Sequence, residues 1–115
     1  MQFNSLYQLY AMQRDRSSQL AAAERLLFMP DALSYLLTGE MVTEYTIAST
    51  SQLLNPRTKR IEARLLEKMG LSPELFPPIV MPGHRIGTLR AELAAACGLP
   101  QLPVIAVAGH DTASA

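Results

Sequence analysis

Cysteine is almost absent from this sequence, since Cys97 is the only one among its 115 residues. A single thiol cannot form an internal disulfide, which favours a reducing compartment and argues against a small secreted scaffold. Long apolar runs are absent as well, because none approaches the roughly 20 residues that a membrane-spanning helix requires. The first residues show no basic segment followed by an apolar one, as a signal peptide would. We therefore expect a cytoplasmic protein with no membrane partner.

An excess of charge of one sign is also lacking. Ten Lys and Arg residues balance ten Asp and Glu residues, so the formal net charge is zero. A balanced surface gives no electrostatic attraction to DNA, RNA or an anionic membrane, and we expect no nucleic-acid partner. Because 49% of the residues are hydrophobic, one core can be filled, and the length fits one domain.

Motifs that hold nucleotide phosphates or metals are missing. The sequence has neither G-x-x-x-x-G-K-[ST] nor G-x-G-x-x-G, so nothing in it predicts a phosphate cradle. His84 and His110 lie far apart, with no acid or cysteine at ligand spacing, which argues against a metal site. Cys97 lies on an apolar helical face, and we expect a buried, inert thiol there.

Most of the chain reads as helical. The first expected helix has apolar residues at i, i+3, i+4 and i+7, the spacing of one helical face. They are Phe3, Leu6, Tyr7 and Tyr10. Residues 18–25 predict a short helix or turn, and residues 43–54 a short packed helix or a polar loop.

A further helix is predicted after Pro30, because Asp31 can accept hydrogen bonds from the free N–H groups of a first turn. Its buried side would consist of three leucines, Leu33, Leu36 and Leu37. Gly39 would end it as a left-handed C-cap.

Glycines also mark the ends of two later helices. Residues 61–69 form an amphipathic pattern that stops at Gly70. Thr88 can cap a helix over residues 89–97, which Gly98 would end.

Residues 104–108 form a continuous apolar run between Pro103 and Gly109, which favours a buried strand. A lone buried strand leaves N–H and C=O groups unpaired on both edges. The chain does not clearly supply neighbours, so we expect them outside this chain or in the partner of a dimer. The expected fold class is mainly α with at least one buried β-strand.

The candidate site follows this strand, at Gly109, His110, Asp111 and Thr112. Glycine lets the backbone turn sharply, and Asp111 at a helix start would be favoured in its ionised form. Such a carboxylate can act as a general base or hold a hydroxyl group, with donors from His110 and Thr112 beside it. The residues alone also allow a plainer interpretation, which they favour: Asp111 simply caps a helix.

Several stretches, collinear along the whole chain, resemble the FGGY family of carbohydrate kinases. They are residues 3–9, 27–31, 35–40, 44–46, 48–50, 52–56, 75–77, 82–83 and 104–115. The last stretch, with its HDTASA ending, is the most specific. Other branches of the family carry a Gly-Asp ending here, and His-Asp-Thr resembles the branch that acts on L-rhamnulose.

The resemblance implies a fragment of an α/β actin-like (ribonuclease H-like) sugar kinase domain. Residues 1–115 would be the later half of the N-terminal domain, and residues 109–115 the catalytic loop at the crossing to the second domain. Asp111 matches the catalytic base, and His110, Asp111 and Thr112 match positions that contact the sugar.

The implied reaction transfers the γ-phosphate of ATP to the 1-hydroxyl of L-rhamnulose with Mg²⁺, in a cleft between two domains that close. The phosphate loop and the adenosine site of the family match nothing in this chain. ATP and Mg²⁺ are therefore expected in the full-length parent and not on this chain, which we expect to be inactive alone.

Two alternatives stay open. The first is that the parent is another FGGY kinase, for xylulose, ribulose, fuculose or glycerol. The second is that the chain is not part of an enzyme but a helical module that associates through apolar faces. In either case, exposed apolar surface would favour self-association of the chain.

Overall fold

The structure is a computed structural model, and it describes residues 3–115. Its helices are α1 (Ser5–Arg14), α2 (Ser18–Ala22), α3 (Met29–Thr38), α4 (Tyr45–Ser49), α5 (Ala63–Lys68), α6 (Ala91–Cys97) and α7 (Asp111–Ser114), with a 3₁₀ turn, η1, at Pro73–Leu75. Its strands are β1 (Thr43–Glu44), β2 (Leu54–Asn55), β3 (Arg60–Ile61), β4 (Ile79–Val80), β5 (Arg85–Thr88) and β6 (Pro103–Ile105).

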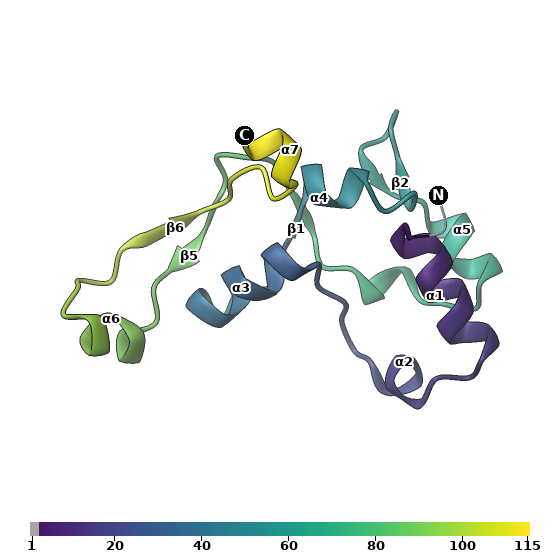
Figure 1. The fold of residues 1–115 in the computed structure, drawn as a ribbon, viewed down its shortest axis with the longest axis horizontal. Helices are drawn as coiled ribbons and strands as arrows, with labels where there is room; N and C mark the ends of the chain where they lie inside the picture. Colours follow the sequence, from purple (N-terminus) through teal and green to yellow (C-terminus); the bar gives the residue numbers. More distant parts are fainter. Residues whose placement is uncertain (1–2) are drawn as a thin grey trace.

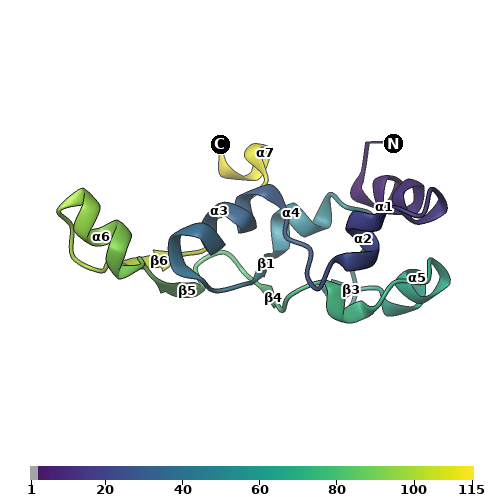
Figure 2. The ribbon, with the colours of Figure 1, turned by 90° about the horizontal axis from the view of Figure 1, so that it is seen from below.

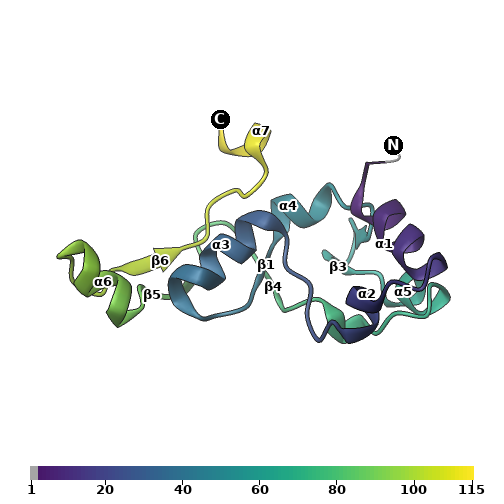
Figure 3. The same ribbon diagram turned by 60° about the horizontal axis from the view of Figure 1, so that its bottom comes forward.

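The molecule is elongated, with extents of 47 × 31 × 21 Å. The β5–β6 hairpin and α6 project at one end, and α1, α2 and α5 gather at the other (Figures 1 and 2). Helices α3 and α4 lie between these ends (Figure 3). The radius of gyration is 15.4 Å, against about 13 Å for a compact domain of this length. Among the described residues, the helices are too short or too polar to traverse a bilayer.

The strands form three two-stranded pairs. β1 pairs with β4 in parallel, with Thr43 opposite Ile79. β2 and β3 form an antiparallel hairpin. β5 and β6 are also antiparallel, with Thr88 opposite Pro103 and an irregular register between Arg85 and Gly87.

Two separate apolar clusters replace one continuous core. The larger joins α1, α2, α5 and η1, and its buried members are Leu9, Leu20, Leu53, Leu66, Leu75 and Phe76. The smaller lies between β4 and the hairpin, and its buried members are Val80, Ile86 and Ala106. The segment from α3 to α4 connects the two.

The predicted helix ends at glycine are confirmed. Gly39, Gly70 and Gly98 have φ values of 86°, 71° and 65°, which are left-handed. A side chain on Cβ disfavours this region, so glycine stops each helix at little cost. Ser72 caps η1, because its hydroxyl accepts the N–H of Glu74.

The apolar stripe that predicts the first helix is not the face that α1 buries. Phe3, Tyr7 and Tyr10 are exposed, whereas Leu9 is buried. Leu6 and Met12 pack with Leu9 against the larger cluster. Apolar spacing predicts a helix, but the neighbouring elements decide which of two overlapping stripes is covered.

The predicted buried face and N-cap of α3 are wrong, although its end at Gly39 is confirmed. Leu33 and Leu36 are 59% and 60% exposed, and Leu37 is exposed too. Asp31 is not the cap, because the helix begins at Met29 after Phe28. Asp31 lies in the first turn and is buried, on the side that faces Glu44.

Helix α6 also differs from expectation. It begins at Ala91, and Thr88 belongs to β5 instead of capping it. Cys97 is exposed. Ala94 is the residue that α6 buries, so this helix covers little apolar surface.

The predicted strand is present but shorter, over Pro103–Ile105, and the chain does supply one neighbour, β5. Ala106 is buried, whereas Ile105 and Val107 are exposed. Within residues 3–115, the strand is thus covered on one face and exposed on the other. Its expected full burial is not reached.

The two leucine environments can be compared by mutation. Leu66 is 0% exposed in the larger cluster and Leu36 is 60% exposed. We expect Leu66→Ala to lower the free energy of unfolding by about 2–5 kcal/mol, because it leaves a cavity. Leu36→Ala should change it by less than about 0.5 kcal/mol. Urea unfolding followed by circular dichroism measures both, and equal losses would contradict this assignment of the core.

Candidate functional site

The segment after β6 leads directly into α7. Asp111 begins this helix, as predicted, and α7 lies beside the start of α4 (Figure 1). The Asp111 side chain is 93% exposed. Its Oδ1 accepts the N–H of Thr112 at 2.7 Å. The structure therefore presents this carboxylate to solvent at a helix start.

The charge state of Asp111 follows from its neighbours. The backbone N–H and the hydroxyl of Thr112 donate to the carboxylate, and together with His110 they lower the pKa of Asp111. His110 Nε2 lies 3.5 Å from Asp111 Oδ1. His110 and Thr112 thus both contact Asp111, and its carboxylate is ionised at neutral pH.

Capping explains only part of this arrangement. The N-cap position of α7 is His110, whose side chain makes no capping bond. Within residues 3–115, the hydrogen bonds to Asp111 all go to Oδ1. Oδ2 is open toward solvent, where a hydroxyl group can approach it.

Glu44 is a site residue that the sequence did not single out. It is 3% exposed and occupies the N-cap position of α4. Its carboxylate accepts from Thr46 N at 2.8 Å, Thr46 Oγ1 at 2.6 Å and Ile47 N at 3.2 Å. It also accepts from Gly109 N at 2.8 Å, across 65 residues of sequence.

Burial acts to raise the pKa of Glu44, but its hydrogen bonds from Thr46, Gly109 and Ile47 outweigh burial and leave the pKa below its ordinary value. The capping role of Glu44 had no signal in the sequence, because the favoured N-cap residues are Ser, Thr, Asp and Asn and not Glu. The bond to Gly109 had none either, since no local pattern encodes it.

Gly109 has a role other than the sharp turn expected of it. Its backbone is not in the left-handed region. A Cβ at this position would lie 3.1 Å from Glu44 Oε2 and 3.3 Å from the Cβ of Pro30. A side chain here would push Glu44 or Pro30 away by a few tenths of an ångström, so glycine favours the close approach of the loop to Glu44.

Asp31 lies on the other side of Glu44. Its Oδ1 accepts the N–H of Glu44 at 3.1 Å, and its buried Oδ2 has no partner among the described residues. Burial raises the pKa of Asp31 to about 6; the nearby charge of Glu44 adds to this, and the bond from the Glu44 N–H offsets part of it. A cavity of about 150 Å³ adjoins Asp31, Glu44 and Gly109, with walls from β5 and the end of β6.

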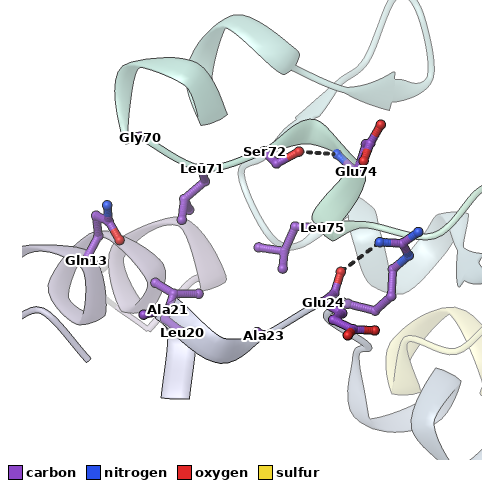
Figure 4. A pocket seen from close by; sticks show the side chains of 11 residues that line it. Gln13, Leu20, Ala21, Ala23, Glu24, Gly70, Leu71, Ser72, Glu74 and Leu75 are labelled. Atoms are coloured by element: carbon purple, nitrogen blue, oxygen red, sulfur yellow. Dashed lines mark hydrogen bonds between the residues drawn. The ribbon is translucent and has the colours of Figure 1, made fainter. Parts of the chain in front are cut away.

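The other hollows are remote from Asp111. One of about 360 Å³ lies between α2 and η1 and is lined by Leu20, Leu71 and Leu75 among others (Figure 4). A second, of about 480 Å³, lies near Pro77 and Pro78. Neither includes a predicted site residue.

The described residues do not fit a resident metal ion. Within residues 3–115, no three His, Cys, Asp or Glu side chains are grouped so that they could hold one. His84 is exposed in a turn.

Comparisons with known proteins match this chain over its full length. Residues 1–115 match the model of the FGGY family of carbohydrate kinases, N-terminal domain. A protein of Bacteroides thetaiotaomicron named rhamnulokinase is 59% identical over 115 residues, which is 100% of this chain and 24% of that protein. A rhamnulokinase of Enterococcus faecalis is 45% identical over 98% of this chain and 22% of its own length. The chain thus spans about a quarter of the length of these relatives.

Solved structures of sugar kinases match the fold of this chain. A xylulose kinase from Rhodospirillum rubrum is 29% identical with a TM-score of 0.80, over 93% of this chain and 22% of its own. A gluconate kinase from Lactobacillus acidophilus has a TM-score of 0.87 at 22% identity, over 93% of this chain and 22% of its own. At that identity the likeness concerns the fold alone.

The buried carboxyl of Asp31 makes stability depend on pH. Its pKa is 3.8 ordinarily and about 6 in the folded chain, so the folded state keeps a proton that the unfolded state has released. The stabilising contribution is complete below about pH 4 and is lost as the pH rises through about 6. We expect Asp31→Asn to remove this loss, which amounts to up to about 3 kcal/mol.

Urea unfolding of both proteins from pH 4 to 7 measures this difference. Glu44, whose pKa is lowered, contributes the opposite trend in both proteins, so the difference between the curves reports Asp31 together with its coupling to Glu44. If the free energies of unfolding of the two proteins changed in parallel over this range, the raised pKa of Asp31 would be contradicted.

Proposed function

Since the chain belongs to the FGGY family of carbohydrate kinases, we propose that it is the part of a longer sugar kinase that carries the catalytic carboxylate, Asp111. Residues 1–115 would form the later half of the N-terminal domain. Residues 109–115 would be the loop at the crossing to the second domain. Family membership argues against a helical module without chemistry.

The observation that carries this proposal is the exposed, ionised Asp111 on a loop whose backbone is anchored to Glu44. A sugar hydroxyl is a poor nucleophile, and a carboxylate within hydrogen-bond reach can orient it and accept its proton. A lowered pKa makes Asp111 a weak proton acceptor while it is exposed. Cover by substrate and by the rest of the parent would raise that pKa by desolvation.

The proposed substrate is L-rhamnulose, phosphorylated at its 1-hydroxyl. Two relatives at 59% and 45% identity are named rhamnulokinase. His110 and Thr112 flank Asp111, so they are placed to contact the same sugar. Their side chains offer the ring nitrogens and a hydroxyl, which suit a polyhydroxylated ligand.

ATP and Mg²⁺ belong to the parent in this proposal. When bound, they supply the phosphoryl group and neutralise its charge. Neither a glycine-rich phosphate loop nor a cluster of metal ligands is found in residues 3–115. This chain's contribution is therefore to hold the acceptor sugar and its proton.

A xylulose substrate is the second candidate, because structures named xylulose kinase match at 29–30% identity. The higher identity of the rhamnulokinases favours rhamnulose. A panel of ketoses offered to the parent enzyme with ATP distinguishes the two by kcat/KM.

Asp111→Asn in the full-length parent should lower kcat by about 10²–10⁴-fold while sugar binding stays largely intact, because the amide keeps the shape and loses the proton acceptor. Asp15→Asn, an exposed aspartate paired with Arg14, is the control and should turn over normally. A coupled ADP-release assay and sugar titration measure both quantities. Turnover of Asp111→Asn within a few-fold of the native value would remove Asp111 as the base.

The 115-residue chain by itself should not phosphorylate L-rhamnulose, because its sequence contains no glycine-rich phosphate-binding motif. We also expect it to self-associate, since residues such as Phe3, Met29 and Val107 are at least 67% exposed. The same coupled assay tests the first point, with the full-length parent as the positive control. ATP-dependent product formation by the isolated chain would refute it.

A further inference from the structure

Glu44 makes more contacts than a helix cap requires. Two backbone N–H groups of α4, those of Thr46 and Ile47, already satisfy its capping role. The additional bond from Gly109 N at 2.8 Å joins α4 to the segment that leaves β6. The bond is thus tertiary, and it reaches the residue two positions before Asp111.

Thr46 provides a second link between the same two segments. A carboxylate can only accept, so the Thr46 hydroxyl donates to Glu44 Oε2 at 2.6 Å. Its oxygen then accepts the backbone N–H of His110 at 3.2 Å. The N–H groups of two consecutive residues, Gly109 and His110, are therefore held by one carboxylate, directly and through Thr46.

The fit around this link is tight. A methyl group at Gly109 would come within 3.1 Å of Glu44 Oε2. On the opposite side, Asp31 Oδ1 accepts the backbone N–H of Glu44, which fixes the position of the carboxylate's own main chain. The Glu44 carboxylate and the Gly109–His110 backbone therefore restrict each other's position.

We propose that Glu44, acting partly through Thr46, is a positioning residue that fixes the Gly109–His110 backbone and thereby sets where the Asp111 carboxylate stands. The structural part of this inference concerns the chain itself. Its consequence for turnover rests on the proposed function. A catalytic group must be held within about 0.5 Å of its productive place, and a displacement of about 1 Å can cost on the order of 100-fold in rate.

The first arm of the test uses the 115-residue chain and no activity. Thr46→Val keeps the shape of the side chain but removes both hydroxyl bonds, and Thr46→Ser restores them. Amide hydrogen exchange by NMR should show the His110 N–H exchanging about fivefold to tenfold faster in Thr46→Val than in the native chain. Thr46→Ser should return it close to the native rate.

Thr50→Val is the matched control. Its hydroxyl donates to the Ile47 carbonyl at 2.8 Å, at the other end of α4 from the loop. The same substitution there should leave exchange at Gly109 and His110 unchanged. Equal exchange at His110 in the native chain and in Thr46→Val would overturn the inference, whatever the kinetics show.

The second arm uses the full-length parent. Thr46→Val and Glu44→Gln should lower kcat by about 10- to 100-fold, with the KM for ATP unchanged, and Thr46→Ser should recover most of it. Thr46→Val keeps the test decisive if Glu44→Gln does not fold. Full turnover of Thr46→Val beside an inactive Asp111→Asn would overturn the positioning role and leave the proposed function standing. An active Asp111→Asn would overturn the proposed function, and faster exchange at His110 would still support the anchor.

Discussion

The buried charge of Glu44 is the interaction on which the arrangement of the site depends. Removing a carboxylate from water is costly unless hydrogen bonds replace the lost solvation. Here the donors come from two places far apart in sequence, the first turn of α4 and the N–H of Gly109. Neither segment can move away without leaving the charge poorly solvated, so α4 and the loop after β6 hold each other in place.

Two neighbouring acids show how environment divides their roles. Glu44 is surrounded by donors and its pKa is lowered, whereas Asp31 receives one backbone bond and its pKa is raised to about 6. Since Oδ2 of Asp31 is buried without a partner among the described residues, its ionised form is less favoured than that of an exposed aspartate. Glu44 therefore stays ionised beside the loop at Gly109. Asp31 lies behind it, next to the small cavity, and binds a proton more readily.

The sequence predicted the strand before Gly109, the helix start at Asp111 and the helix ends at Gly39, Gly70 and Gly98, because each depends on neighbouring residues. The fold class is confirmed by the matches to sugar kinases of known structure. The apolar stripes that stand out in the sequences of α1 and α3 are largely exposed. Apolar spacing does not say which stripe of a helix is covered by a neighbouring element. Glu44 was missed because its decisive bond spans 65 residues, a distance over which no local pattern reaches.

Position and reactivity are separable at Asp111. The backbone before it is fixed by Glu44 and Thr46, but its side chain is 93% exposed, and bonds from Thr112 together with His110 lower its pKa. Fixed donors establish geometry without substrate, whereas proton affinity rises only when water is excluded. A carboxylate placed in advance but left solvated cannot take up a proton readily until something covers it. In the proposed function, the chain therefore supplies the position of the base, Asp111, and the rest of the parent raises its proton affinity by covering α7.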